Sequence, residues 1–326
     1  MEFSCSRPYS VLVAAACGFS LGYLVAARRG SLETYHGAPR RRFTQAQAAV
    51  PLSASVATED DRGEPPPYAQ QAGQPIGCSR VCIVTGGSRG IGAAVCERLA
   101  ADGYKVLINY QGNRNRADEL CARICANGGH AITEQADVSD VAQVSRMFDK
   151  AEQTLGPVTC CVNNAGILGP LTGLCDDATA DQCAKVMATN LYGTFHVMHE
   201  ACKRMSTARG GRGGAIVNVS AGSAYTGTPL AYAMSKGALN SLSAGSVKEL
   251  AQGGIRLNIV SPGPVLSDMM QNFSASDVAH MANAIPMQRP GEPAEVAAAI
   301  AWLLSDDASF VAGANLRVAG GKPLES

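Results

Sequence analysis

The chain has 326 residues, of which 46% are hydrophobic, and its 27 basic side chains balance its 27 acidic ones, so the formal net charge is zero. This composition supports a sizeable core, and without a basic excess it argues against a nucleic-acid partner. Twelve cysteines occur without a Cys-x-x-Cys motif or paired Cys/His spacing. They indicate buried, reduced thiols in a reducing compartment rather than a disulfide framework, and no metal site is expected.

Residues 1–77 differ in character from the rest of the chain. Residues 11–27 carry no charge and are followed by two arginines, a length that fits either a short membrane span or the apolar part of a signal segment. Up to residue 56 there are six arginines, no lysine and two acids, which is typical of a transit peptide. Residues 51–77, rich in Pro, Gln, Gly and Ala, are typical of a disordered linker. We therefore expect a leader that directs the chain to an organelle, with a mitochondrion or plastid favoured, or that anchors it in a membrane through residues 11–27.

A glycine cluster follows the first apolar run of the remaining sequence. Residues 81–84 (Val-Cys-Ile-Val) lead into residues 85–92 (Thr-Gly-Gly-Ser-Arg-Gly-Ile-Gly), and Ile91, Val95 and Leu99 continue at helical spacing. The order is strand, glycine turn and helix. Glycines let the backbone approach a ligand closely, and the start of a helix presents free N–H groups to an anion. A dinucleotide pyrophosphate is the partner that this implies, although an ordinary turn between a strand and a helix has the same pattern.

Downstream, apolar strands alternate with helices, as in parallel β-α-β units. The strand runs are apolar throughout, which is expected when helices cover both faces of a sheet. Residues 78–326 are therefore predicted to form a single doubly wound α/β domain of the Rossmann type that binds NAD(P), with an irregular, Met-rich lid at 264–290. We predict strands at 105–110, 130–138, 158–163, 215–220, 255–260 and 315–318, and helices at 114–127, 140–155, 177–206, 232–253 and 293–305.

The end of the second predicted strand bears on the choice of cofactor. Dinucleotide folds usually place an acid there to bind the adenosine 2′-hydroxyl, but this chain has Asn109 and Tyr110. Arg89 lies in the glycine turn, and Arg114 and Arg116 follow the strand. Guanidinium groups without a competing carboxylate favour a 2′-phosphate, and hence NADP over NAD. Arg114 and Arg116 also fit a purely solvated helix start, so Arg89 is the stronger candidate.

Tyr232 and Lys236 are four residues apart in a predicted helix, so their side chains share one face. A free tyrosine has a pKa of about 10. A neighbouring ammonium is expected to favour the phenolate and lower that pKa, which would give an acid–base group that works near neutral pH. The same spacing also occurs on ordinary helix surfaces. Its position after a strand of the predicted sheet favours the catalytic interpretation.

The sequence resembles the short-chain dehydrogenase/reductase family, and within it the sugar dehydrogenases and 3-oxoacyl-carrier-protein reductases. The resemblance extends from about residue 81 to residue 321, nearly the whole predicted domain. The matching motifs, in the family's order, are the glycine cluster at 85–92, Asp137-Val138, Asn163-Asn164-Ala165-Gly166, Asn190, Tyr232-x-x-x-Lys236 and Pro262-Gly263.

The resemblance implies an oxidoreductase in which Tyr232 exchanges a proton with a carbonyl oxygen while a hydride moves to or from the carbon. It further implies that Lys236 tunes Tyr232 and bonds the nicotinamide ribose, and that Asn190 holds a water that relays protons to Lys236. For Asn190, an amide that bonds the backbone inside a helix fits equally well. The implied cofactor-binding positions are Gly86, Ser88, Arg89, Ile91, Asn109, Tyr110, Asp137, Val138, Asn164, Ala165, Gly166, Tyr232, Lys236, Pro262, Gly263 and Val265.

One position departs from the family's pattern. The family places a serine three residues after the asparagine of the fifth strand, where it donates a hydrogen bond to the substrate oxygen, but here that position is Ala221. Ser220 precedes it by one residue and would point to the other face of a regular strand, and Ser223 lies in the following turn. The sequence leaves three alternatives: Ser220 replaces the missing donor, Ser223 replaces it, or neither does.

The leading hypothesis is an NADP-dependent enzyme that interconverts a small carbonyl compound and an alcohol. The alternative is a non-catalytic NADP-binding scaffold or sensor tethered to a membrane, suggested by Ala221 and the leader. The substrate is not specified by residues 168–176 or 264–289, which carry no chemistry-specific side chains. By analogy with the family, a homo-oligomer is expected through the helices around Asn190 and Lys236.

Overall fold

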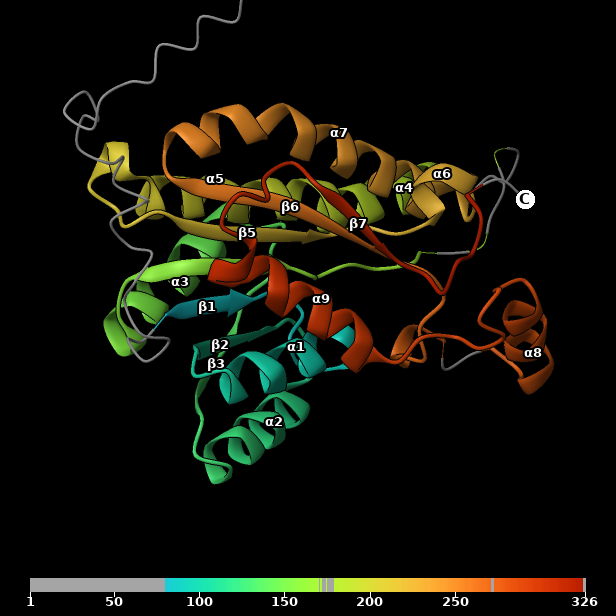
Figure 1. The fold of residues 1–326 in the computed structure, drawn as a ribbon, viewed down its shortest axis with the longest axis horizontal. Coiled ribbons are helices and arrows are strands. Elements are labelled where there is room, and N and C mark those ends of the chain that lie inside the picture. The colour runs from blue at the N-terminus through green and yellow to red at the C-terminus, as the bar shows by residue number, and fades with distance from the viewer. Residues whose placement is uncertain (1–79, 170, 172–173, 175–178, 271–272, 325–326) are drawn as a thin grey trace, which may run out of the picture. The chain divides into compact units, whose positions relative to one another are not determined.

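The computed structural model describes residues 80–169, 171, 174, 179–270 and 273–324. The predicted leader and linker, residues 1–77, lie outside these ranges. The described residues contain a seven-stranded sheet in the order β3-β2-β1-β4-β5-β6-β7, in which every neighbouring pair is parallel (Figure 1). The strands are β1 (Val81–Val84), β2 (Lys105–Tyr110), β3 (His130–Gln135), β4 (Val158–Asn163), β5 (Gly214–Val219), β6 (Ile255–Pro262) and β7 (Asn315–Val318).

Helices connect the strands and cover both faces of the sheet (Figure 1). Three 3₁₀ turns, η4 (Thr207–Arg209), η5 (Asp268–Met270) and η6 (Asp306–Ala308), complete the regular structure of the described residues. The helices are α1 (Gly90–Ala101), α2 (Arg114–Ala126), α3 (Val141–Leu155), α4 (Thr179–Met187), the π-helical segment η3 (Ala188–Gly193), α5 (Thr194–Met205), α6 (Ser223–Thr226), α7 (Leu230–Gln252), α8 (Ala275–Asn283) and α9 (Pro293–Leu304).

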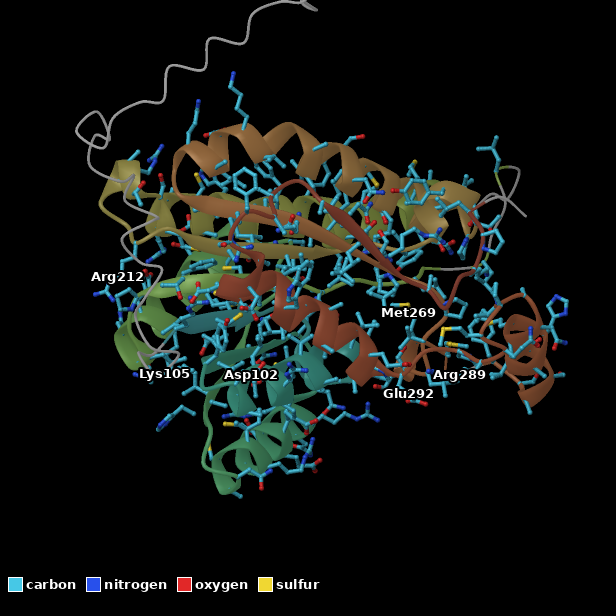
Figure 2. All side chains as sticks on the ribbon, in the orientation of Figure 1. Asp102, Lys105, Arg212, Met269, Arg289 and Glu292 are labelled. Atoms are coloured by element: carbon cyan, nitrogen blue, oxygen red, sulfur yellow. The ribbon has the colours of Figure 1, made fainter. Side chains whose placement is uncertain are left out.

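All strands begin at one edge of the sheet and end at the other, because they are parallel. Lys105, which begins β2, and Met269, which follows β6, lie at opposite ends of the view in Figure 2. The carboxyl ends of β1, β4, β5 and β6 therefore meet at one edge, and the loops that follow them share that side of the molecule.

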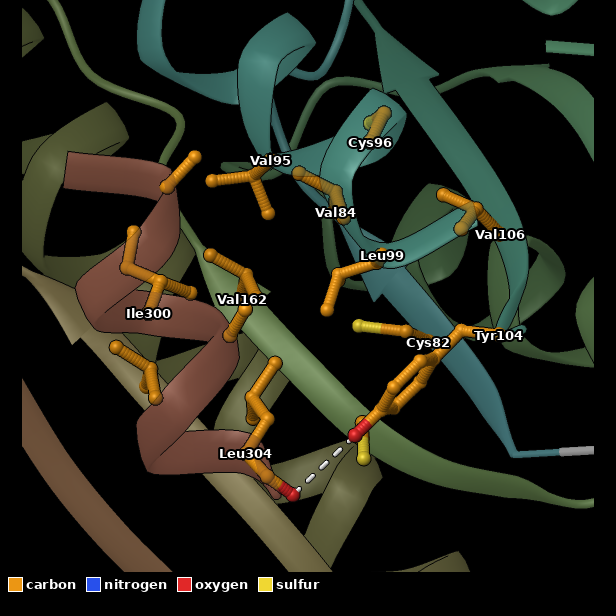
Figure 3. Close-up of a cluster of buried hydrophobic side chains, with 14 of the residues drawn as sticks. Cys82, Val84, Val95, Cys96, Leu99, Tyr104, Val106, Val162, Ile300 and Leu304 are labelled. Carbon is orange, nitrogen blue, oxygen red and sulfur yellow. Dashed lines mark hydrogen bonds between the residues drawn. The ribbon is translucent and has the colours of Figure 1, made fainter. Parts of the chain in front are cut away.

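Two buried clusters hold the layers together, one on each face of the sheet. On the first face, Val95 and Leu99 of α1 and Ile300 and Leu304 of α9 pack on strand residues such as Val162 (Figure 3). The second cluster joins α3, α5 and α7 to the opposite face through fully buried side chains that include Phe148, Met205 and Leu257. This arrangement confirms the predicted doubly wound α/β fold and explains why the strand runs lack a polar face.

Three predicted elements are wrong in detail. The strand predicted at 130–138 ends at Gln135, where its pairing with β2 ends at Tyr110. The helix predicted at 177–206 is continuous over 179–205 but contains the π-helical segment η3, and residues 177–178 lie outside the described ranges. The stretch 264–290 is not wholly irregular, since it contains α8, whose start is fixed by a reciprocal capping box between Ser274 and Asp277.

The described cysteines are all free, and Cys82, Cys96, Cys160 and Cys161 are buried, as predicted. Cys125 departs from that expectation because it is exposed on α2. The apolar run 11–27 lies outside the described residues. Among the helices that the structure does describe, none has the length and apolarity needed to span a membrane.

Candidate active site

A cavity of about 880 Å³ lies where the carboxyl ends of the central strands meet. Its wall includes the glycine turn after β1, the ends of β5 and β6, and one face of α7. Asn190 does not line it, and neither do the weaker candidates Arg114 and Arg116. The predicted residues that line it are Gly86, Ser88, Arg89, Ile91, Asn109, Tyr110, Asp137, Val138, Asn164, Ala165, Gly166, Ser220, Tyr232, Lys236, Pro262, Gly263 and Val265.

The glycine turn has no room for side chains at its tightest point. Gly86 and Gly90 adopt positive φ angles of 61° and 54°. At Gly92, a Cβ atom would lie 2.3 Å from the Gly86 carbonyl oxygen and 2.5 Å from the side-chain nitrogen of Asn164. That nitrogen donates hydrogen bonds to the Thr85 and Gly86 carbonyls, at 2.9 and 3.0 Å. The turn is therefore held in one shape, with its backbone directly beside the cavity.

The start of α1 suits an anion. Arg89 occupies the N-cap position, yet its side chain makes no capping hydrogen bond, and the first turn of α1 contains no acidic residue. The first N–H groups of the helix therefore keep their capacity to bind negative charge, which the helix dipole reinforces. Together with the exposed backbone of the glycine turn, these N–H groups fit the pyrophosphate of a dinucleotide.

At the adenosine side, two of the predicted residues serve the protein's own structure. The Asn109 carbonyl oxygen Oδ1 accepts from the Gly86 N–H at 3.2 Å, and its Nδ2 donates to the Ala136 carbonyl at 3.0 Å. Asp137 accepts from the N–H and hydroxyl of Ser139 and from Gln111 at 2.7 Å. Both still line the cavity, so they shape the surface that an adenosine would meet.

The three candidate guanidinium groups are not equivalent. Arg89 lines the cavity, whereas Arg114 and Arg116 do not. Arg114 is largely exposed and pairs with Asp118 within α2. Arg116 reaches across to Asp268 of η5, with 2.6 Å between Nη1 and Oδ1. This ion pair ties the segment after β6 to α2, next to the adenosine side of the cavity.

Tyr232 and Lys236 lie one turn apart on α7, with the Lys236 Nζ atom 5.6 Å from the centre of the Tyr232 ring. Lys236 is only 3% exposed, and its ammonium donates to the Val219 carbonyl at the end of β5, at 2.7 Å. Burial lowers the pKa of Lys236 from 10.5 to about 8. Burial also raises the pKa of Tyr232 from 10.0 to about 12.

The direction of the Tyr232 shift corrects the prediction that Lys236 lowers its pKa. Burial is the cause of the rise, because removing the phenol from water disfavours its charged form. The protein alone therefore keeps Tyr232 as a neutral proton donor around neutral pH.

Asn190 acts behind the cavity wall, in the π-helical segment η3. Its Oδ1 accepts from the Ile167 N–H at 2.8 Å, and its Nδ2 donates to the Ile167 carbonyl and to the Ser235 hydroxyl, both at 3.0 Å. The side chain thus forms hydrogen bonds with backbone groups, as in the second alternative from the sequence. These groups belong to the loop after β4, however, and not to the helix that contains Asn190. Asn190 fixes that loop, including Gly166, against α7.

The hydroxyl groups near Ala221 differ in their bonding. Ser220 is buried, and its hydroxyl donates to the Lys236 carbonyl at 3.4 Å. Ser223 begins α6 and lines the cavity, and within the described residues its hydroxyl makes no hydrogen bond. Ser223 is therefore the residue whose donor remains available to a ligand.

Sequence reasoning underused Thr85, the first residue of the glycine cluster. Its hydroxyl accepts from the N–H groups of Asn164 and Ala165, at 3.0 and 3.1 Å, and so joins the turn after β1 to the loop after β4. The position of a hydroxyl side chain directly before a glycine turn is the pattern that could have identified Thr85. The lining also includes Arg317 and Lys322, near the C-terminus, which no motif indicated.

Comparisons with known proteins identify the family of the chain. A family model described as enoyl-(acyl carrier protein) reductase matches residues 86–322. The uncharacterized oxidoreductase YgfF of Escherichia coli (strain K12) is 45% identical over 246 residues, covering 74% of this chain and 99% of that protein. The 3-oxoacyl-[acyl-carrier-protein] reductase FabG of Staphylococcus aureus (strain Mu50) is 33% identical over 245 residues, covering 74% and 98%.

Among solved structures, a short-chain dehydrogenase/reductase from Serratia marcescens matches with a TM-score of 0.70 and 31% identity, covering 76% of this chain and 99% of that one. A dehydrogenase/reductase from Sinorhizobium meliloti matches with a TM-score of 0.69 and 30% identity, covering 76% and 96%. The similarity therefore extends over essentially the whole length of each relative. With the glycine turn and the Tyr232–Lys236 pair on one cavity, it shows that the chain is an oxidoreductase of the short-chain dehydrogenase/reductase family.

Proposed function

We propose that the protein interconverts a carbonyl compound and an alcohol with NADP as its cofactor. The observation that carries the proposal is that Tyr232 and Lys236 line the same cavity as an uncapped helix start and a glycine turn shaped for a pyrophosphate. A relative named a 3-oxoacyl-[acyl-carrier-protein] reductase favours the reductive direction.

The bound nicotinamide would supply the hydride, or accept it in the reverse direction. The glycine turn and the α1 N–H groups would hold the pyrophosphate, and Pro262, Gly263 and Val265 would border the nicotinamide. Tyr232 would donate its phenolic proton to the substrate oxygen, a role suited to a group that burial keeps protonated. The positive charge of Lys236 would stabilise the phenolate that results.

Ser223 is our candidate for the second donor to the substrate oxygen, in place of the serine missing at Ala221. Its hydroxyl lines the cavity without a partner among the described residues, whereas the Ser220 hydroxyl bonds Lys236. Ser223→Ala should lower kcat by on the order of tenfold or more if this donor acts in the transition state. Ser220→Ala is the matched control and should leave kcat nearly unchanged.

The preference for NADP is carried by Arg89, because no carboxylate stands at Asn109 to compete for the 2′-phosphate. Arg89→Gln should raise the Kd for NADPH by about tenfold and leave the Kd for NADH nearly unchanged, since only NADPH carries the phosphate. Equal losses for both cofactors would contradict the assignment.

The test of the activity is NADPH oxidation by the full-length protein over a panel of ketones, with the corresponding alcohols and NADP⁺ in the reverse direction. Tyr232→Phe should reduce kcat by on the order of a hundredfold or more, while the Kd for NADPH changes little. Equal turnover by both proteins would refute the role of Tyr232. Tight NADPH binding without any turnover would instead favour the non-catalytic scaffold. Turnover that appears in Ala221→Ser would show that the activity was lost with the missing serine.

Two further expectations from the sequence remain proposals. Exposed Tyr192 and Phe195, on η3 and α5, favour a homo-oligomer, which sedimentation of wild type and Phe195→Glu would test.

We also propose that residues 1–77 direct the protein to an organelle or anchor it in a membrane. Imaging and membrane fractionation of the full chain, beside a chain lacking residues 1–77, would separate targeting from anchoring.

A further inference from the structure

Two cations line the cavity at a place that the proposed chemistry does not use. Arg317 is on β7, Lys322 is in the segment that follows, and both contribute to the cavity wall. The Arg317 guanidinium donates to the Lys322 carbonyl, which holds that segment against the strand. Among the described residues, neither cation forms an ion pair with a carboxylate.

The order of the strands puts these cations at the β7 end of the sheet, away from the glycine turn. The glycine turn follows β1, and β6 and β7 lie beyond β4 and β5 on the far side of it. The Gly263 N–H bonds the Val318 carbonyl at 2.9 Å, so the end of β7 adjoins the region expected to border the nicotinamide. Asn315 of β7 also donates to the Tyr225 hydroxyl of α6, the helix just before Tyr232.

The carboxylates in the cavity wall do not neutralise this side. The wall contains Asp137 and Asp268. Asp137 follows β3 at the opposite end of the sheet, where it binds Ser139 and Gln111. Asp268 is engaged by Arg116. Among the residues that the structure describes, the two cations on the β7 side therefore have no carboxylate of the cavity wall paired with them.

Apolar side chains that follow β6 contribute to the same wall. Met269 and Met270 of η5, Phe273 before α8 and Met281 of α8 line the cavity. Methionine and phenylalanine side chains adapt to an aliphatic body without offering it hydrogen bonds. The lid predicted from the Met-rich sequence thus supplies the apolar surface, and β7 with its following segment supplies the charge.

We infer that the substrate is an anionic oxo compound, with an aliphatic body against the methionines and a carboxylate or similar anion against Arg317 and Lys322. This inference rests on the proposed carbonyl chemistry and adds the substrate class to it. A guanidinium and an ammonium near one another match a carboxylate well, because both donate charge-assisted hydrogen bonds.

The test compares 5-oxohexanoate with its methyl ester, which share the ketone and the chain but differ in charge. With NADPH and the full-length protein at low salt, kcat/KM for the acid should exceed that for the ester by about tenfold, the value of one charge-assisted contact. Lys322→Gln and Arg317→Gln should each raise KM for the acid and leave KM for the ester unchanged. Lys248→Gln, an exposed lysine of α7 outside the cavity wall, is the matched control. Added salt should reduce the preference.

Equal kcat/KM for acid and ester in the wild type, or equal losses on both in the two variants, would overturn the inference and leave the proposed function standing. If the protein binds NADPH but reduces neither these two compounds nor any ketone of the panel described above, the proposed function fails. Calorimetry of the NADPH complex with hexanoate and with 1-hexanol then decides the charge preference. A preference for hexanoate that Lys322→Gln removes supports the anion site, and equal binding overturns it.

Discussion

Lys236 should give the protein a stability that rises with pH. Burial lowers its pKa from 10.5 to about 8 in the folded state. Between these values the unfolded chain binds a proton that the native protein does not, so the free energy of unfolding increases with pH across this window. At 1.36 kcal/mol per unit, the total gain is about 3 kcal/mol, absent below the folded pKa and complete above the unfolded one.

Lys236→Met removes this titration and also leaves the Val219 carbonyl without its donor. The lost hydrogen bond costs about 1–3 kcal/mol at every pH, so the sign of the change at neutral pH alone is not diagnostic. The slope with pH is diagnostic. Tyr232 acts in the opposite sense, because its raised pKa makes stability fall above about pH 10. The buried thiols of Cys82, Cys96, Cys160 and Cys161 act in the same sense as Tyr232, because burial raises their pKa, but both proteins contain them and their effect cancels in the comparison. The measurement therefore belongs between about pH 7 and pH 10.

Urea unfolding of the cofactor-free, full-length protein under reducing conditions measures the slope. From about pH 7 to pH 10, wild type should gain about 2–3 kcal/mol more than Lys236→Met. Repeating the comparison in a Tyr232→Phe background removes the contribution of the phenol to the pH dependence of unfolding. Lys248→Met, at an exposed lysine, is the second control and should show the same pH dependence as wild type. Parallel curves for wild type and Lys236→Met would refute the claim that burial disfavours the ammonium.

Three other predictions concern the cofactor side of the cavity. Gly92→Ala should abolish measurable NADPH binding in a fluorescence titration, because the added Cβ would collide with the turn. Its control is Gly245→Ala, whose Cβ would meet nothing within 4 Å. That variant should stabilise α7 by about 1 kcal/mol in thermal unfolding. Asp268→Asn, which weakens the ion pair with Arg116, should speed NADPH release by roughly threefold at low salt in stopped-flow displacement, and an unchanged rate would show that the pair does not restrain this segment. Asn109→Asp loses the bond to the Ala136 carbonyl and should lower stability by about 1–3 kcal/mol and weaken NADPH more than NADH; equal Kd changes would contradict the second part.

The sequence predicted the fold and part of the cavity wall because the relevant patterns are local. Positive φ angles at Gly86 and Gly90 are available to glycine without strain, so the turn can be recognised from its glycines. Four-residue spacing places Tyr232 and Lys236 on one side of α7 whatever packs around them. Parallel strands then bring loops from distant parts of the chain to one edge.

Features that depend on packing could not be predicted in the same way. The π-helical segment around Asn190 has no signature in its residues, because it is fixed by bonds to Ile167 and Ser235, which are distant in sequence. The direction of the Tyr232 pKa shift depends on how much water burial removes, and spacing carries no information on that. The ion pair between Arg116 and Asp268 joins residues 152 positions apart.

Asn109 links cofactor choice to the stability of the turn. An amide donates as well as accepts, so this one side chain accepts from the Gly86 N–H and donates to the Ala136 carbonyl. A carboxylate, which only accepts when ionised, could replace the first bond but not the second, and it would be 2% exposed at a site where a charge is costly. If NADP is the cofactor, as proposed, the missing acid therefore does more than leave room for the 2′-phosphate. The Asn109 amide takes its place and joins the glycine turn to the ends of β2 and β3. One residue therefore accounts both for the shape of the turn and for the absence of a competing carboxylate.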